Sequence, residues 1–153
     1  MLFRGLVLTI RFSIMALAAT ALVASPAAAK EWRIAMVNRG TSGSMDFTPA
    51  FVRIAPGDSV RFVAQDKSHN VESIPELTPG GGTLFKGKLN SDVIVKFTLP
   101  GLYGYKCLPH YAMGMVGLVE VGSAVNKAAF VSNLVKLPPL ARMRMTKFVQ
   151  LAK

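Results

Sequence analysis

Residues 106–115 read KCLPHYAMGM, and the rest of the chain is best understood by asking what would hold this stretch in place. The stretch contains Cys107, the only cysteine among the 153 residues, and His110, one of two histidines. The other histidine is His69, and Met115 closes the stretch. One thiolate, two imidazoles and a thioether form the donor set of an electron-transfer copper site.

Each of these residues also has a plainer interpretation. A lone cysteine such as Cys107 is often a small buried hydrophobe, His69 could be an ordinary hydrogen-bonded histidine, and Met115 could pack in a core. A zinc site needs four harder ligands in a tetrahedral array, and a catalytic Cys–His pair needs an element that lowers the pKa of the thiol. The sequence has few acidic residues near the stretch and places the cysteine at a strand end, so the four residues together favour copper.

The first 29 residues are predicted to be a cleaved secretory signal peptide. Arg4 and Arg11 give it a positive start, residues 12–23 are apolar, Pro26 breaks a helix, and three alanines precede Lys30. An uncleaved membrane anchor is the alternative, but a spanning helix needs about 20 apolar residues. We therefore expect export to the periplasm, where an unpaired cysteine is buried, joined to another chain or bound to a metal.

The charge of the chain predicts an anionic partner. The sequence has 18 basic and 8 acidic side chains, a net charge of +10, and loses two of the basic ones with the signal peptide. Nucleic acid is an improbable partner for an exported protein, so an acidic protein surface is the better prediction. The residues that remain are enough for one domain with a single core.

Short apolar segments separated by glycine and proline turns predict a β-sandwich or barrel. In residues 60–63, for example, Val60 and Phe62 share one face while Arg61 and Val63 share the other. The expected strands are residues 32–37, 51–54, 60–63, 69–74, 93–99, 102–107 and 117–121, and the expected loops are residues 38–46 and 75–89.

The end of the chain changes to helical periodicity. We expect a helix over residues 126–135, with Ser123 as its start signal, and a second helix over residues 140–152. In the second helix the side chains expected to face the sandwich are Leu140, Met143, Phe148 and Leu151, and those expected in solvent are Arg142, Arg144 and Lys147. The predicted organisation is a signal peptide (1–29), a sandwich (30–122) and a helical extension packed on it (123–153).

From Lys30 onwards the chain resembles the pseudoazurins, type 1 blue-copper proteins of the cupredoxin family. The matching segments are NRG (38–40), MDFTPA (45–50), APGD (55–58), SHNVESI (68–74) and KCLPHYAMGMVG (106–117). The spacing Cys-x-x-His-x-x-x-x-Met is shared with plastocyanin. The continuation YAMGM and the two-helix tail favour the pseudoazurins over plastocyanin, amicyanin and azurin.

The resemblance implies a mainly β fold, an eight-stranded Greek-key sandwich with two C-terminal helices. It implies one copper ion, cycling between Cu(I) and Cu(II), bound by His69, Cys107, His110 and Met115. Around these ligands it implies roles for Asn38, Asn70 and Pro109. The backbone N–H of Asn70 would approach the sulfur, its side chain would tie the two ligand segments together, and Pro109 has no N–H to offer the sulfur.

The resemblance also implies a docking surface around His110, whose ring edge would pass the electron. Met45, Pro109 and Met113 match the positions of an apolar patch, and the plain alternative for the two methionines is core packing. A basic ring would surround the patch, formed by Arg39, Lys67, Lys86, Lys88 and Lys106. Such a ring steers encounter with an acidic partner without adding much lasting affinity. Glu76 and Leu108 depart from the family pattern.

The function implied is a periplasmic electron carrier that is not an enzyme. The implied acceptor is a copper nitrite reductase, with nitrous oxide reductase or a c-type cytochrome as alternatives. We expect a monomer, with no nucleic acid partner and no stable membrane association. Two other classes stay open, a copper chaperone or storage protein with an exchangeable open site, and a thiol enzyme with a reactive, accessible Cys107.

Overall fold

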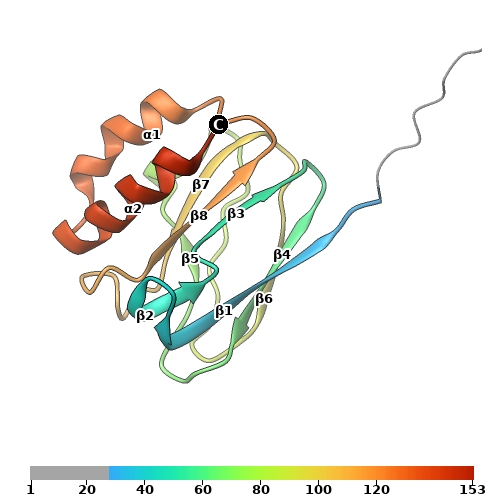
Figure 1. Cartoon of the computed structure of the whole chain (residues 1–153). Helices are drawn as coiled ribbons and strands as arrows, with labels where there is room; N and C mark the ends of the chain where they lie inside the picture. Colours follow the sequence, from blue (N-terminus) through green and yellow to red (C-terminus); the bar gives the residue numbers. More distant parts are fainter. Residues whose placement is uncertain (1–27) are drawn as a thin grey trace, which may run out of the picture.

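The computed structural model describes residues 28–153, and these form eight strands, two α-helices and two short 3₁₀ helices (Figure 1). The mainly β fold with a helical tail is as predicted. The elements are β1 (Glu31–Gly40), β2 (Gly43–Thr48), β3 (Phe51–Ile54), β4 (Ser59–Ala64), β5 (Glu72–Ser73), η1 (Pro75–Leu77), β6 (Val93–Lys96), β7 (Gly101–Lys106), β8 (Val116–Val121), α1 (Lys127–Asn133), η2 (Leu134–Lys136) and α2 (Pro139–Leu151). Nearly all of the predicted signal peptide lies outside the described residues. Within residues 28–153 no helix is long and apolar enough to cross a bilayer.

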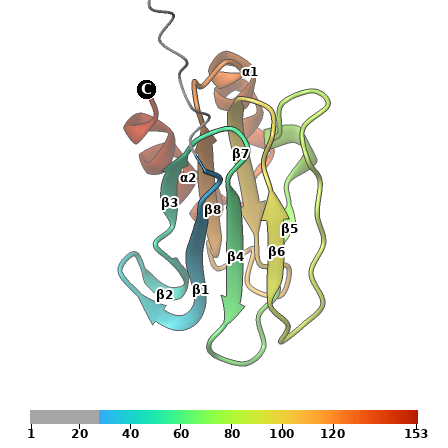
Figure 2. The ribbon, with the colours of Figure 1, turned by 90° about the vertical axis from the view of Figure 1, so that its right-hand side faces the viewer.

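The strands form two four-stranded sheets. One has the order β2-β1-β4-β6 and the other the order β3-β8-β7-β5. The pairs β1–β4 and β3–β8 are parallel, and the remaining neighbours are antiparallel. In Figure 2 the sheet containing β1, β4 and β6 lies in front, and the helices lie beyond β7 and β8.

The core between the sheets is rich in aromatic rings. Tyr105 of β7 meets Phe47 of β2 and Phe62 of β4 edge to face, at centroid distances of 4.8 and 5.0 Å. Such contacts add to the free energy gained by burying large apolar side chains. The alternation expected for residues 60–63 is present, because Val60 and Phe62 are buried while their neighbours are half-buried.

The helical tail covers the outer face of the second sheet and forms a second apolar cluster there. Phe130 of α1 and Met145 of α2 pack with Leu102 and Leu118 of that sheet. All six residues of β8 are buried, because the strand has the sandwich core on one side and the tail on the other.

Several local predictions were wrong. The expected loop at residues 38–46 is the β1–β2 hairpin, whose tight turn uses Gly43 at a φ of 125°. The expected strand at residues 69–74 shortens to β5, and strand 93–99 ends at Lys96. The first helix begins at Lys127, one residue after its predicted start, but its N-cap residue is Asn126 and not Ser123, and the Asn126 side chain pairs with the backbone N–H and C=O of Leu102.

The face of α2 that packs on the sheet also differs from the prediction. Its buried side chains are Ala141, Met145, Phe148 and Val149. Leu140, Met143 and Leu151 are about half exposed. The small Ala141 and Ala152 complete a buried stripe at helical spacing, and a search for large apolar residues overlooks them. Arg144, expected in solvent, is half-buried and bonded to the sandwich.

Candidate metal centre

Three donor atoms gather at one end of the sandwich. The Nδ1 atoms of His69 and His110 are 3.1 Å apart, and they lie 3.8 and 3.5 Å from the Sγ atom of Cys107. A triangle with these sides has a centre about 2.0 Å from each corner, close to ordinary metal–nitrogen distances of about 2.0–2.1 Å and somewhat short of metal–sulfur distances of about 2.3 Å. The three side chains therefore fit around one small metal ion.

Strand pairing brings the ligand-bearing segments together. Because β1 and β4 are parallel, both end at the same edge, and the chain leaving β4 reaches His69 shortly after. Cys107 directly follows β7, whose last residue Lys106 pairs with Glu72 just after the His69 segment. The sequence thus presents the histidine and the cysteine from two sheets at one rim.

The orientation of His69 is fixed by Asn38, near the end of β1. The Nε2 atom of His69 is 3.0 Å from Oδ1 of Asn38, an oxygen that can only accept a hydrogen bond. The proton therefore belongs on Nε2, and Nδ1 directs a lone pair at the cluster. Burial lowers the pKa of His69, and the nearby His110 lowers it further, which favours the neutral ring that metal binding requires.

The ligand loop, residues 107–115, is closed by its own backbone. The N–H of Cys107 donates to the carbonyl of Met115 at 3.0 Å, and the N–H of Met115 donates to the carbonyl of His110 at 3.1 Å. Met115 is fully buried in the cluster that contains Cys107. The loop therefore holds a thiol, an imidazole and a thioether in one compact turn.

The Cys107 thiol is fully buried and sits among backbone donors. Burial raises the pKa of the Cys107 thiol, while the backbone N–H groups of Asn70 and His110 act to lower it. A bound metal cation deprotonates such a thiol outright. Asn70 also accepts a hydrogen bond at Oδ1 from the N–H of Leu108, at 2.8 Å, which ties the two ligand segments together.

His110 differs from the other donors because it is half-exposed. Of the apolar patch (Met45, Pro109 and Met113), Pro109 and Met113 are exposed and Met45 is half-buried against the sandwich core. Leu108 adds a further exposed apolar side chain beside them. The route from the cluster to solvent thus ends in an apolar surface.

The basic ring is not uniform. Arg39, Lys67, Lys86 and Lys88 are exposed. Lys106 is half-buried, pairs with Glu72 at 3.4 Å and lies 4.7 Å from the ring centre of Tyr111. Part of its charge is therefore already neutralised within the protein.

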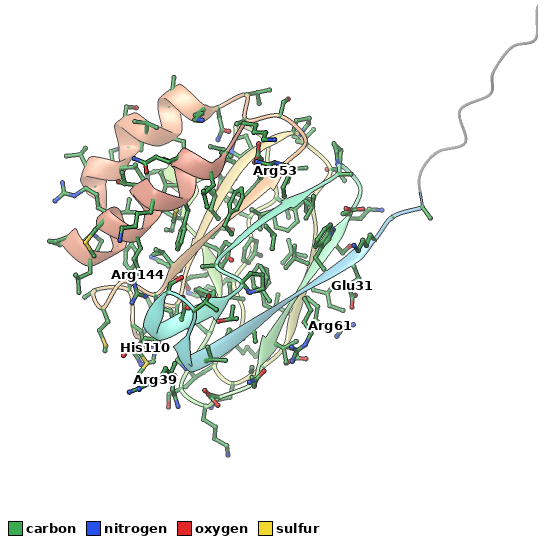
Figure 3. The ribbon with its side chains drawn as sticks, viewed as in Figure 1. Glu31, Arg39, Arg53, Arg61, His110 and Arg144 are labelled. Atoms are coloured by element: carbon green, nitrogen blue, oxygen red, sulfur yellow. The ribbon has the colours of Figure 1, made fainter. Side chains whose placement is uncertain are left out.

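One residue at this end of the molecule, Arg144, is not predicted by the sequence to belong to the site. Arg144 of α2 donates hydrogen bonds to backbone carbonyls of Ser44, Met45 and Gly114. Because its partners are backbone atoms, no residue type in the sequence points to them. Figure 3 shows Arg144, His110 and Arg39 on the same side of the molecule.

Comparison with known proteins agrees with this geometry. Residues 34–122 match the family of copper binding proteins of the plastocyanin/azurin type. The pseudoazurin of Paracoccus pantotrophus is 50% identical over 133 residues, which cover 86% of this chain and 91% of the relative. The pseudoazurin of Methylorubrum extorquens is 47% identical over 122 residues, 80% of this chain and 79% of the relative.

A solved structure shows the same fold. The crystal structure of pseudoazurin from Methylobacterium extorquens AM1 superposes with a TM-score of 0.74 at 43% identity, covering 79% of this chain and 98% of that one. Both the sequence relatives and the superposition span the sandwich together with the ligand loop. The chain belongs to the pseudoazurins, within the plastocyanin/azurin family of copper-binding proteins.

Proposed function

We propose that the protein is a periplasmic carrier of single electrons that holds one copper ion with His69, Cys107, His110 and Met115. The observation that carries the proposal is the convergence of two imidazole Nδ1 atoms and one thiol within 3.8 Å of one another, with His110 alone of the four half-exposed. The secretory signal proposed over residues 1–29 would deliver it to the periplasm.

The donor set suits reversible one-electron chemistry. Sulfur donors favour Cu(I), and imidazole binds both oxidation states, so bound copper supplies a Cu(II)/Cu(I) couple. The loop hydrogen bonds between Cys107, His110 and Met115 hold the donors in place. Because the ligands stay in place, little reorganisation energy is needed when one electron arrives from a donor protein or leaves to an acceptor. No proton is transferred, and no covalent bond forms or breaks.

His110 is the proposed electron port. His69, Cys107 and Met115 are fully buried, whereas His110 is half-exposed and follows the exposed Pro109 of the apolar patch in the ligand loop. A partner that covers Pro109 and Met113 would bring its own redox centre close to this ring. An apolar contact of this kind excludes water at the point of transfer while leaving the complex short-lived.

The exposed members of the basic ring favour an acidic partner protein. Arg39, Lys67, Lys86 and Lys88 raise the rate of encounter through long-range attraction, and Lys106 contributes less because Glu72 pairs with it. The partner that we propose first is a copper nitrite reductase, followed by nitrous oxide reductase or a c-type cytochrome. We propose that the carrier acts as a monomer, without nucleic acid or stable membrane contact.

The burial of Cys107 disfavours the two competing classes. A thiol enzyme needs its sulfur accessible to substrate, and the sulfur here is fully buried with a raised pKa. A copper chaperone needs an open site from which the metal can be exchanged, whereas three of the four proposed ligands are fully buried.

The test is to add one equivalent of Cu(II) to the purified protein and record its visible spectrum. We expect an intense thiolate-to-copper absorption that a reductant bleaches and an oxidant restores. A colourless protein, or a thiol that still reacts with a thiol reagent when copper is bound, would refute the electron-carrier proposal.

The partner proposal has a separate test, the rate of electron transfer to copper nitrite reductase at increasing salt. We expect the rate to fall steeply, because the Debye length shrinks to about 8 Å at physiological ionic strength. Lys86→Gln should lower the rate at low salt. Lys96→Gln, at an exposed lysine paired with Ser59 at the opposite end of the sandwich, is the matched control and should not. A rate independent of salt would rule out steering by the basic ring.

A further inference from the structure

Arg144 lies on α2, and its guanidinium donates hydrogen bonds to the metal-binding end of the sandwich. Its Nη1 atom donates to the carbonyl oxygens of Met45 at 3.1 Å and Gly114 at 2.9 Å, and its Nη2 atom donates to the carbonyl oxygen of Ser44 at 3.0 Å. The two segments that it joins, the β1–β2 hairpin and the ligand loop, are far apart in the sequence. One guanidinium therefore connects three parts of the chain.

Two glycines make room for this guanidinium. Gly43 has a φ of 125° and Gly114 a φ of 85°, backbone conformations that other residues rarely adopt. A Cβ atom at Gly43 would lie 3.1 Å from Nη2 of Arg144, and one at Gly114 would lie 3.3 Å from its Cδ and 3.2 Å from the backbone of Leu140. The hairpin, the ligand loop and the first turns of α2 are thus fitted together around Arg144.

The carbonyls that Arg144 binds belong to functional segments. Met45 is part of the apolar patch and has a φ of 49°, a left-handed backbone conformation that residues with a side chain rarely adopt. Gly114 immediately precedes Met115, the proposed thioether ligand. Fixing these two carbonyls fixes the backbone from which both methionines extend.

The positive charge of Arg144 also acts on the buried carboxyl of Asp46. The carboxyl of Asp46, next to Met45, is fully buried and accepts a hydrogen bond at Oδ2 from the N–H of Ser42 at 2.8 Å. Burial raises the pKa of Asp46, and the guanidinium of Arg144 acts to lower it. Arg144 therefore favours the ionised carboxylate that orders the hairpin turn.

We propose that Arg144 is a positioning residue of the copper site, which sets the position of Met115 and of the apolar patch relative to His110 from the C-terminal helix. The proposal rests on the function proposed above, because it assigns a role toward the same four ligands. It makes α2 a working part of the site in addition to a cover for the second sheet.

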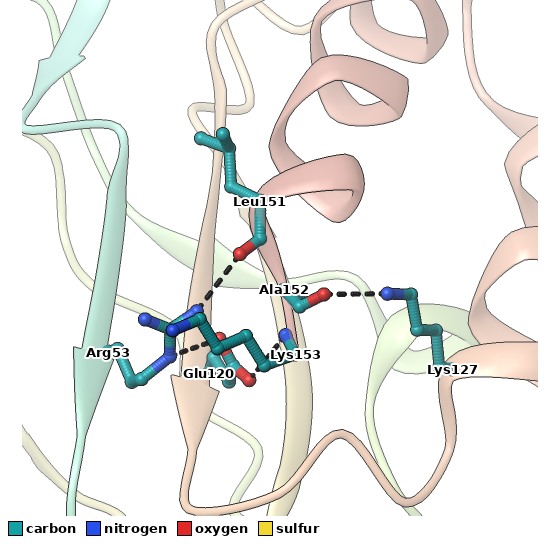
Figure 4. Close-up of polar contacts among 6 residues, drawn as sticks. All are labelled: Arg53, Glu120, Lys127, Leu151, Ala152 and Lys153. Carbon is teal, nitrogen blue, oxygen red and sulfur yellow. Dashed lines mark hydrogen bonds and ion pairs between the residues drawn. The ribbon is translucent and has the colours of Figure 1, made fainter.

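A purely structural role for Arg144 is the competing explanation, and the chain offers a matched control. Arg53 anchors the other end of α2. Its Nη2 atom donates to the carbonyl oxygen of Leu151 at 2.9 Å, and its Nε atom binds Glu120 at 2.8 Å (Figure 4). Figure 3 places Arg53 on the far side of the molecule from His110. Losing either arginine loosens the helix, but only one loss should reach the metal site.

The experiment compares Arg144→Met, Arg144→Lys and Arg53→Met in two forms of the protein. In the copper form, the readouts are the intensity ratio of the visible absorption bands and the reduction potential. In the metal-free form, the readout is amide hydrogen exchange at Gly114 and Met115. We expect Arg144→Met to change the band ratio and the potential and to speed exchange at Met115 about tenfold, since hydrogen bonds from a charged donor are among the stronger ones.

Arg144→Lys should recover part of the wild-type behaviour, because an ammonium can still reach a carbonyl but cannot span all three. Arg53→Met should lower the melting temperature and leave spectrum, potential and exchange at residues 113–115 unchanged. If Arg144→Met does not fold, the same readouts on Arg144→Lys decide the matter.

The proposal is overturned if the Arg144 variants lose only stability, with spectrum, potential and local exchange like those of Arg53→Met. A wild-type protein that gives no colour with Cu(II) would refute the proposed function instead. The exchange measured on the metal-free form would then still show whether Arg144 holds the loop.

Discussion

At one end of the sandwich the polar side chains surround three donor atoms, and at the other end they satisfy one another. The far end, which contains Asp58 and Glu120, is built around two buried carboxylates. Asp58 accepts hydrogen bonds from the backbone N–H of Lys30 at 2.8 Å and from Nε1 of Trp32 at 2.9 Å. Glu120 pairs with Arg53 at 2.8 Å and accepts from the backbone N–H of Lys153 at 3.0 Å.

At the metal end the polar atoms face one another as potential metal ligands. His69 and His110 direct ring nitrogens at each other and at a thiol, and lone pairs held this close are stabilised by a cation between them. The buried carboxylates of the far end have backbone and side-chain donors as partners and need no ligand. The comparison indicates that substitutions at the far end change stability without changing the spectrum, and that substitutions at the metal end change the spectrum.

The largest effect is expected at the centre of the metal end. Cys107→Ser keeps the size of the side chain but replaces the soft thiolate by a hydroxyl, which is a poor ligand for Cu(I). We expect complete loss of the intense visible absorption when Cu(II) is added. The same titration followed by fluorescence or calorimetry should show weaker copper binding, and a variant that kept the colour would remove the sulfur from the site.

The next effect belongs to the far end. Glu120→Gln takes away the negative charge that pairs with Arg53, and we expect the free energy of unfolding to fall by about 2 kcal/mol. The expected loss is smaller than for a fully buried pair, because the side chain of Arg53 is 39% exposed. Urea unfolding of the metal-free protein measures it.

The spectrum is the second half of that test. The copper form of Glu120→Gln should have the wild-type absorption and reduction potential. A shifted spectrum would mean that the two ends are coupled through β8, and the division drawn above would fail.

A third substitution tests the partner of a ligand rather than a ligand. Asn38→Ala removes the oxygen that holds Nε2 of His69, and loss of such a partner costs about 10–100-fold in metal affinity. Asn38→Asp retains an acceptor and should keep more of the affinity. Copper affinity measured by competition with a chelator separates the two variants, and equal losses would show that the hydrogen bond does not matter.

Much of the metal end could be predicted from the sequence because its chemistry is carried by rare residues. With one cysteine and two histidines in the chain, few other ligand sets were available. The alternation of Val60 and Phe62 with Ser59 and Arg61 likewise indicates a strand, because period-two patterns arise directly from strand geometry.

The rest depended on long-range contacts that local patterns do not contain. The glycines and serines of the β1–β2 hairpin have little strand propensity and so predict a loop, whereas pairing across the hairpin, as between Val37 and Asp46 or Arg39 and Ser44, makes the segment a strand. The buried face of α2 differs from the prediction because the helix packs through the small Ala141, which a pattern of large apolar residues leaves out. The role of Arg144 likewise depends on long-range contacts, because its partners are backbone carbonyls that no residue type in the sequence identifies.

The smallest effect, and the one with a characteristic pH dependence, is expected for Asp58→Asn at the far end. Hydrogen bonds from the N–H of Lys30 and from Trp32 lower the pKa of Asp58. A lowered pKa means that the folded protein favours the carboxylate, so its contribution is complete above the unfolded-state pKa of about 3.9 and is lost as the pH falls through the folded value. At pH 7 the variant should be about 1 kcal/mol less stable.

The difference in the free energy of unfolding between wild type and Asp58→Asn should therefore be constant near neutrality and should shrink as the pH falls below about 4.

The hydrogen bond from Lys30 allows a second test, because cleavage after residue 29 would turn the amide N–H of Lys30 into an α-ammonium. The penalty for Asp58→Asn should then be larger in a chain that begins at Lys30 than in one that retains Ala28 and Ala29. Unfolding curves from pH 3 to pH 7 are measured for wild type and Asp58→Asn, each with and without Ala28 and Ala29. They give both the pH dependence of the penalty and its dependence on the chain terminus. Equal penalties would show that the new terminus does not bind Asp58, and a difference that did not shrink between pH 7 and pH 3 would assign the stabilisation to the shape of the side chain instead of its charge.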